Sequence, residues 1–379
     1  LTDDIILIIE SCKEDKNYSL IEEKIKAIKK WDVFINLSYS HGVFPLIYHV
    51  LKKYKDILPN DIFIKLKTIN MDIVKQNMLM TSELFKVIEL LDKNNIEYIA
   101  FKGPSLSQLA YGNITLRQYC DLDILIDTDK LETFSNLLIN NKYTAKEKIV
   151  LLKNKFFIST ANDFSFFSKS NVHIELHWNL FRQVFNKESQ KIDIWNYTNK
   201  TNMNKHSLNT INNELLFVYL SIHGSKHLWE RIEWLVDLNK LVIHNKLDWN
   251  VINSLSKELN VDNMLRLGLI LISELFSTEV PLDLEREVTK KDLKLKEKIL
   301  AMYESSLFFE EGNISHMLYK FKTISLLRNS KVDSIKYILS IIFKPTQYDL
   351  YFVNISSKYS FLYYFVRPYR FLHNLMIKS

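Results

Sequence analysis

Two neighbouring motifs constrain the fold most strongly: Lys102-Gly103-Pro104-Ser105 ends one apolar run, and Asp121-Leu122-Asp123 begins another. Short apolar runs that are bounded by turn residues predict buried strands. Successive side chains on a strand point to opposite faces, so the two aspartates share one face, with Cα atoms roughly 6.5 Å apart. Two adjacent carboxylates repel each other unless a cation joins them. The pattern therefore predicts a divalent metal ion on a strand, and ligands that are all oxygen atoms favour Mg²⁺.

Helix is predicted for most of the remaining chain, because only 6 Gly and 6 Pro occur among 379 residues. Helical periodicity covers residues 1–85 and resumes at about residue 209. The expected helix caps are Asn60-Asp61, Thr128-Asp129 and, for the helix over Leu215 to Lys226, Asn209 or Thr210. The predicted strands are residues 96–101 and 120–126, and a hairpin of 164–168 with 172–178. We predict a mostly helical α+β fold: an N-terminal helical region at 1–85, a core with a small mixed sheet at 86–200, and a C-terminal helical domain at 201–379.

Charge and cysteine content exclude some classes of function. The net charge of +6 is mild for this size and argues against nucleic acid as the main substrate. Cys12 and Cys120 are isolated and form neither a disulfide framework nor a zinc pattern, so we expect a cytoplasmic protein, with Cys120 as a small buried filler. The longest apolar run, near Leu267 to Ile272, is far too short for a transmembrane segment.

Glu175 is the best candidate for a third carboxylate beside Asp121 and Asp123. It lies on the polar face of a predicted strand, together with His173 and His177. Three carboxylates can hold two metal ions that clamp the attacking and leaving oxygens of a phosphoryl displacement. Glu175 could alternatively act as a general base, or pair with a cation across the hairpin. The three residues are our predicted catalytic and metal-binding set.

Phosphate binding is expected at the turn before the short helix. Backbone N–H groups at Gly103 and the helix N-terminus can meet phosphate oxygens, and Ser105 can add a hydroxyl. Lys102 and Arg117 are the nearest cations that could neutralise charge on a triphosphate.

The motifs together resemble one branch of the polymerase-beta-like nucleotidyltransferase superfamily, the largely uncharacterised bacterial nucleotidyltransferase family. The resemblance covers about residues 31–245. It rests on Lys102-Gly103, Leu116-Arg117, Asp121-Leu122-Asp123, Glu175-Leu176-His177-Trp178, His223-Gly224-Ser225-Lys226-His227 and Trp234-Leu235-Val236-Asp237, with His41-Gly42-Val43-Phe44-Pro45-Leu46 near the start.

This resemblance implies a nucleotidyltransferase core and an enzyme that uses two Mg²⁺ ions, which Mn²⁺ can replace. A nucleoside triphosphate, with ATP as first choice, would donate a nucleoside monophosphate to the hydroxyl of a small molecule, peptide or protein, and pyrophosphate would leave. Lys226 would meet the triphosphate from the C-terminal domain, or would be a plain surface lysine.

Several alternatives stay open. Pro104 departs from the usual Gly-Gly or Gly-Ser turn and removes one N–H, which suits a non-catalytic nucleotide-binding or antitoxin-like module. A template-free RNA-tailing enzyme shares the chemistry. His223 and His227 could supply half of a zinc site, but no third ligand accompanies them.

Four further positions also have two readings each. His177-Trp178 could be the wall of the site or a packed core pair. Asp237 could hold a histidine or cap the substrate cleft, or it could form a structural salt bridge. Arg231 could bind phosphate or lie on a solvated face. The aromatic and basic tail at 361–371 could touch a membrane or partner, or close the core.

Overall fold

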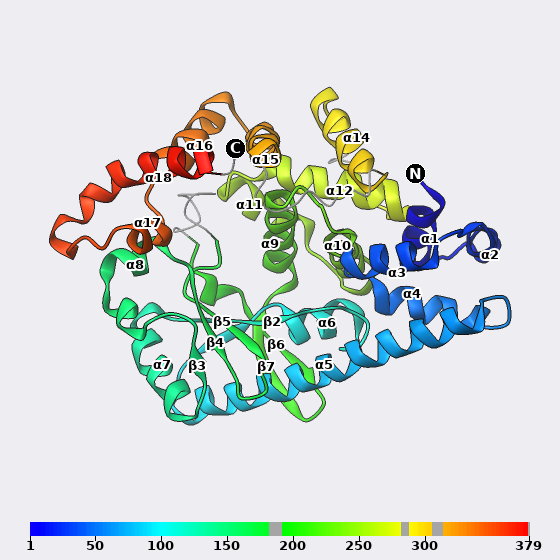
Figure 1. Cartoon of the computed structure of the whole chain (residues 1–379), viewed down its shortest axis with the longest axis horizontal. Coiled ribbons are helices and arrows are strands. Elements are labelled where there is room, and N and C mark those ends of the chain that lie inside the picture. The colour runs from blue at the N-terminus through cyan, green and yellow to red at the C-terminus, as the bar shows by residue number, and fades with distance from the viewer. Residues whose placement is uncertain (182–191, 282–287, 305–313, 378–379) are drawn as a thin grey trace.

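The computed structural model describes residues 1–181, 192–281, 288–304 and 314–377, and it shows a mostly helical α+β protein built around a small mixed sheet (Figure 1). The sheet has the strand order β1-β2-β5-β4-β3. Its strands are β1 (Tyr98–Ala100), β2 (Asp121–Ile126), β3 (Thr144–Ala145), β4 (Asp163–Phe167) and β5 (His173–His177). Only the β2–β5 pairing is parallel, and the other three pairings are antiparallel. The predicted fold class and the four predicted strands are confirmed.

Four short helices precede the sheet: α1 (Asp3–Cys12), α2 (Tyr18–Ala27), α3 (Trp31–Ser40) and α4 (Phe44–Leu51). At the turn between α3 and α4, Gly42 has a φ of +74°, and a Cβ there would lie 1.6 Å from the Glu233 carboxylate on a distant helix. Only glycine therefore fits where the N-terminal helices meet the C-terminal ones.

The helix α5 (Asn60–Lys93) connects the two larger hydrophobic cores of the described structure and runs along one side of it (Figure 1). Its first half, with Leu66 and Ile73, packs into a core shared by the N-terminal helices and helices of the C-terminal region. Its second half, from Met80 onward, packs into the core around the sheet. Because a helix of 34 residues is about 50 Å long, one element can serve both cores.

Short helices pack beside the sheet and a second, two-stranded sheet follows it. The helices are α6 (Gly103–Tyr111), α7 (Leu131–Asn140) and α8 (Lys155–Thr160), and the additional strands are β6 (Thr198–Met203) and β7 (His206–Ile211). The hairpin β6–β7 was not predicted. The expected caps Asn209 and Thr210 are strand residues of β7, and Asn212 caps the next helix by accepting a hydrogen bond from the Leu215 N–H.

The C-terminal region is helical, as predicted. Its helices are α9 (Asn213–Lys226), α10 (Ile232–His244), α11 (Trp249–Glu258), α12 (Asp262–Phe276), α14 (Lys290–Glu304), α15 (Ile314–Leu326), α16 (Lys331–Phe343), α17 (Gln347–Phe352) and α18 (Tyr363–Ile377). No helix in the described residues has the length and apolar content to cross a bilayer. The three-region division made from the sequence stays a prediction.

Two other expected caps differ from the structure. Pro59, and not Asn60-Asp61, occupies the cap position of α5, and it makes no side-chain cap. Asp127 caps the 3-10 turn Thr128–Lys130, which leads directly into α7. In both cases the predicted helix exists, but the cap position lies one residue before the expected capping side chain, because α5 begins at Asn60 and the 3-10 turn before α7 begins at Thr128.

Candidate active site

The parallel pairing of β2 with β5 brings the predicted carboxylates together. Asp121 lies opposite His173, and Asp123 lies opposite Glu175, so their side chains emerge from one face of adjacent strands. Two groups result, Asp121 with His173 and Glu175, and Asp123 with Glu175 and His177; within each group the ligand atoms lie within 4.8 Å of one another. Glu175 belongs to both groups.

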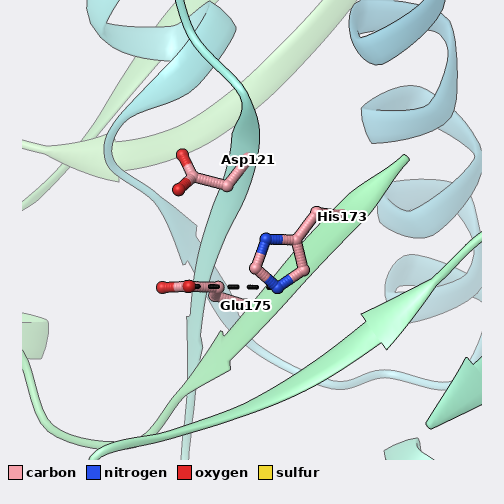
Figure 2. A group of neighbouring side chains, drawn as sticks. All are labelled: Asp121, His173 and Glu175. Carbon is pink, nitrogen blue, oxygen red and sulfur yellow. Dashed lines mark ion pairs between the residues drawn. The ribbon is translucent and has the colours of Figure 1, made fainter. Parts of the chain in front are cut away.

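Figure 2 shows the outer group, in which Asp121, Glu175 and His173 surround a common space. The Nε2 atom of His173 lies 3.9 Å from a Glu175 oxygen and 3.0 Å from the Ser165 hydroxyl. The sequence did not mark His173 as a site residue. The signal was present, because His173, Glu175 and His177 alternate along one face of the strand.

The inner group centres on Asp123, which is buried and carries two cationic neighbours. The Nε2 atom of His177 lies 2.9 Å from Asp123 Oδ1, and the Lys102 Nζ atom lies 3.4 Å from the same oxygen. Burial alone would raise the pKa of Asp123, but Lys102 and His177 outweigh it and hold that pKa far below its ordinary value. The other oxygen, Oδ2, is buried without a hydrogen-bond partner among the described residues.

His177 is a protonated member of the site. Burial lowers its pKa, but hydrogen bonds to Asp123 and Glu175 outweigh this and raise the pKa to about 9. Its Nε2 atom lies 3.4 Å from Glu175 Oε2, and this contact lowers the pKa of Glu175. His177 therefore belongs to the wall of the site, whereas Trp178 is buried and donates its indole N–H to the Ile158 carbonyl.

The acidic groups fit a divalent cation on two observations. Burial, followed by repulsion from Asp123, raises the pKa of Asp121, so the cluster is short of positive charge. The Oδ2 atom of Asp123 also has no partner and could accept a metal bond. Asp121, Asp123 and Glu175 supply oxygen ligands, as Mg²⁺ requires.

The glycine turn lies directly against the aspartate strand. Gly103 has a φ of +52°, and a Cβ there would lie 3.0 Å from the Asp121 carbonyl oxygen. The preceding Lys102 extends to Asp123, and its ammonium also sits 5.6 Å from the Tyr219 ring centroid. Burial lowers the pKa of Lys102, but Asp123 outweighs it and raises that pKa above its ordinary value, so the lysine stays charged.

Pro104 and Ser105 form the first turn of α6. Pro104 occupies a position where a helix needs no donor, so the turn tolerates it. Ser105 is fully buried, and its Oγ atom has no hydrogen-bond partner within the described ranges. Neither residue lines the pocket described next.

A pocket of about 230 Å³ opens beside the carboxylates. Asp121 and Glu175 supply acidic groups to its lining, and α9 supplies another part of the lining. The α9 residues Tyr219, His223 and Lys226 recur at helical spacing and face the pocket together. Lys226 lines the same pocket as Lys102, and its contact with a triphosphate stays a prediction. Tyr219 was missed, although its spacing from Lys226 could have identified it.

Arg117 lies in a different environment from the one expected for a phosphate ligand. Its guanidinium makes two hydrogen bonds to Asp237, at 2.8 Å and 3.0 Å, and the Tyr111 hydroxyl donates to the same carboxylate at 2.7 Å. All three side chains are buried, and none lines the pocket. Of the two readings of Asp237, the structural salt bridge is the observed one.

Of the remaining candidates, His223 lines the pocket, whereas His227, Arg231 and Cys120 are not in its lining. In the part of the chain that the structure describes, His223 and His227 join no group of three potential metal ligands, and both rings pack against Trp234. Arg231 pairs with Glu233 at 3.0 Å. Cys120 is exposed, so its expected role as a buried filler is wrong.

Comparison with solved structures gives two distant similarities. A lincomycin-bound lincosamide antibiotic adenylyltransferase, LnuA, is 15% identical with a TM-score of 0.29, covering 42% of this chain and 94% of its own. An antigenic nucleotidyltransferase-like protein from Paracoccidioides brasiliensis is 15% identical with a TM-score of 0.33, covering 54% of this chain and 88% of its own. At these scores neither similarity carries an argument about the site.

Comparison by sequence is more informative. No curated protein matches the chain. The sequence model of one family, described as uncharacterised nucleotidyltransferase, matches residues 28–277, which include every residue of the pocket. The chain therefore belongs to this family of uncharacterised nucleotidyltransferases.

Proposed function

We propose that the protein transfers a nucleoside monophosphate from a nucleoside triphosphate, ATP being the first choice, to a hydroxyl of a small molecule, peptide or protein. The single observation that carries the proposal is the convergence of Asp121, Asp123 and Glu175 on one face of β2 and β5, beside a pocket with two lysines. A carboxylate cluster with two lysines at one pocket suits a metal–triphosphate complex, in which cations and phosphates alternate.

Asp121, Asp123 and Glu175 would hold two Mg²⁺ ions. When bound, such ions neutralise charge on the triphosphate and lower the pKa of a coordinated hydroxyl. His177 holds Asp123 and Glu175 in position, because it contacts both carboxylates. Its role is therefore to orient ligands rather than to touch the substrate.

Lys102 and Lys226 would contact the phosphates in the pocket. Gly103 allows the backbone to approach closely, and the start of α6 would offer N–H groups to phosphate oxygens. Ser105 could add its buried hydroxyl only if the turn opens. Arg117 would act through Asp237, by fixing α6 and β2 against α10, without touching the nucleotide.

In the transfer, an acceptor oxygen forms a bond to the α-phosphorus while the bond from that phosphorus to the bridging oxygen breaks, and pyrophosphate leaves. Glu175 accepts the hydroxyl proton and aligns the oxygen. The reaction would take place in the cytoplasm, in agreement with the two unpaired cysteines.

The test uses nucleoside triphosphates labelled at the α-phosphate, Mg²⁺ and a pool of hydroxyl acceptors from a metabolite and peptide extract. Transfer of label by the wild type and its loss in Asp123→Asn support the proposal. Asp129→Asn is the matched control, because Asp129 is an exposed aspartate outside the pocket. Equal transfer by wild type and Asp123→Asn would refute it.

A further inference from the structure

The C-terminal helices expose an unusual amount of apolar surface. Of the thirty large apolar side chains that are exposed in the described part of the chain, sixteen lie between Val332 and Leu372, about a ninth of the sequence. We call this surface, formed by α16 to α18, the C-terminal apolar face; it forms one end of the molecule (Figure 1). Apolar surface concentrated in this way marks an interaction site.

Helix α18 exposes several large apolar side chains, although it also buries Tyr363 and packs Val366 against the core around the sheet. Its outward side chains are apolar: Phe365 is 72% exposed, Tyr369 60% and Leu372 57%. Its inward side carries charge, since the buried Arg370 pairs with Asp349 at 2.6 Å. The inward polar groups are thus satisfied inside the protein, and the apolar groups face outward.

Helix α16, which packs against α18, adds further exposed apolar side chains. Val332, Ile335 and Leu339 recur at helical spacing and are 58%, 58% and 49% exposed. The opposite side of the helix buries Tyr337 and Ile341, which complete its packing against the protein. The exposed row is therefore additional to what the fold needs.

The charge around this face is positive. Residues 331–374 contain six Lys and Arg but only two acidic residues, and one of these, Asp349, is neutralised by Arg370. A groove of about 1360 Å³ adjoins the face, since Tyr351 and Lys358 line the groove and are also exposed on the face. The groove adds Lys146, Lys148, Lys153 and Lys155, and one acidic residue, Glu147, among its described lining.

We propose that the C-terminal apolar face docks on an anionic lipid bilayer, with its aromatic and aliphatic side chains in the interface and its lysines at the headgroups. Exposed tyrosines and lysines around an apolar helix face are the composition of interfacial helices. A second copy of the chain fits less well, because a symmetric interface would bring the same lysines together. Protein interfaces in general are depleted of lysine, which argues against another protein.

The proposal is independent of the transfer reaction. The full chain is sedimented with vesicles of phosphatidylcholine alone and of phosphatidylcholine with phosphatidylglycerol. We expect binding to the anionic vesicles, and at least a tenfold loss in the triple variant Phe365→Ser/Tyr369→Ser/Leu372→Ser. The matched control is Ile64→Ser/Met71→Ser/Met78→Ser, since these side chains of α5 are 55%, 48% and 59% exposed. Melting curves of both variants verify that they fold.

Two further measurements define the mode of binding. Each of Lys331→Gln, Lys336→Gln and Lys358→Gln should weaken binding to anionic vesicles about fivefold at low salt. Phe365→Trp should show a blue shift on vesicles beyond that of the wild type, because no tryptophan follows Trp249 in the sequence.

Three outcomes overturn the proposal: no binding to anionic vesicles, binding that the serine variant leaves intact, or equal binding to both vesicle types. A concentration-dependent dimer that the serine variant dissolves would show that a second copy covers the face instead. Transfer activity in the absence of lipid should be the same in wild type and serine variant, because the substituted residues lie outside the pocket.

Discussion

Two buried pairs of opposite charge, Lys102 with Asp123 and Arg117 with Asp237, differ in one decisive respect. In the Arg117 pair, which we call the sealed pair, the guanidinium and the Tyr111 hydroxyl together satisfy both oxygens of Asp237. In the Lys102 pair, which we call the open pair, the nitrogen–oxygen distance is 3.4 Å. Asp123 retains an oxygen without a hydrogen-bond partner in the described structure. A sealed pair holds elements together, whereas an incompletely satisfied one beside a pocket can accept a ligand.

The largest expected effect is the loss of nucleotide transfer when the open pair is changed. Asp123→Asn should lower kcat/KM at least about 10³-fold, because the charge stabilisation supplied by a bound metal amounts to several kcal/mol. The folded state should survive, since the amide has the same shape. Transfer of label measures the activity, and a melting curve on the same preparation measures the folding of the variant. If Asp123→Asn keeps its activity, the open pair has no more part in transfer than the sealed pair.

Breaking the sealed pair should act on stability instead. Arg117→Met leaves Asp237 buried without its cation, so we expect a loss of about 3–5 kcal/mol in the free energy of unfolding. Lys153→Met removes only an exposed ion pair with Glu132 and should cost less than about 1 kcal/mol. Denaturant titration measures both. If Arg117→Met were stable but unable to bind nucleotide, Arg117 would be a phosphate ligand after all.

The pH dependence of the free energy of unfolding should report on His177, which contacts Asp123 of the open pair. The pKa of His177 is raised to about 9, so its contribution to stability is complete below the ordinary value near 6.5 and is lost as the pH rises through 9. Without metal, the wild type should lose about 3 kcal/mol across this window relative to His177→Gln. Lys153→Met, which keeps His177 and removes only the exposed ion pair with Glu132, should show the wild-type pH profile. Parallel profiles for wild type and His177→Gln would contradict the assignment.

The smallest expected effect concerns Lys226. It lines the same pocket as the carboxylates, so Lys226→Met should raise the KM for the nucleoside triphosphate about tenfold, as expected for the loss of one charged contact. Lys200→Met, an exposed lysine of β6, is the control. Equal KM values in the two variants would place the phosphates away from α9.

The features that the sequence predicted best are local ones. The strand with Asp121 and Asp123, the turn at Gly103 and the strand of Glu175 each carry their signal within a few residues. The hairpin β6–β7 was missed because Thr198–Met203 is polar and largely exposed, which leaves no alternating apolar pattern.

Pairings between distant segments could not be predicted in this way. Arg117 and Asp237 are 120 residues apart, and their ion pair depends on how α10 docks against α6 and β2. The parallel register that places His173 opposite Asp121 likewise arises from tertiary structure. The sequence indicated which residues could be functional. Only the fold showed that Arg117 pairs with Asp237 away from the pocket, whereas Lys102 lines the pocket.

Calorimetry with a non-hydrolysable ATP analogue tests the central claim most directly. Wild type, Asp123→Asn and Asp129→Asn are titrated in Mg²⁺ and again in excess chelator. If the open pair is a metal–nucleotide site, wild type and Asp129→Asn should bind the analogue at least about tenfold more tightly with Mg²⁺, and Asp123→Asn should lose this difference. Binding that is equally tight in chelator, or equally metal-dependent in Asp123→Asn, would contradict the claim.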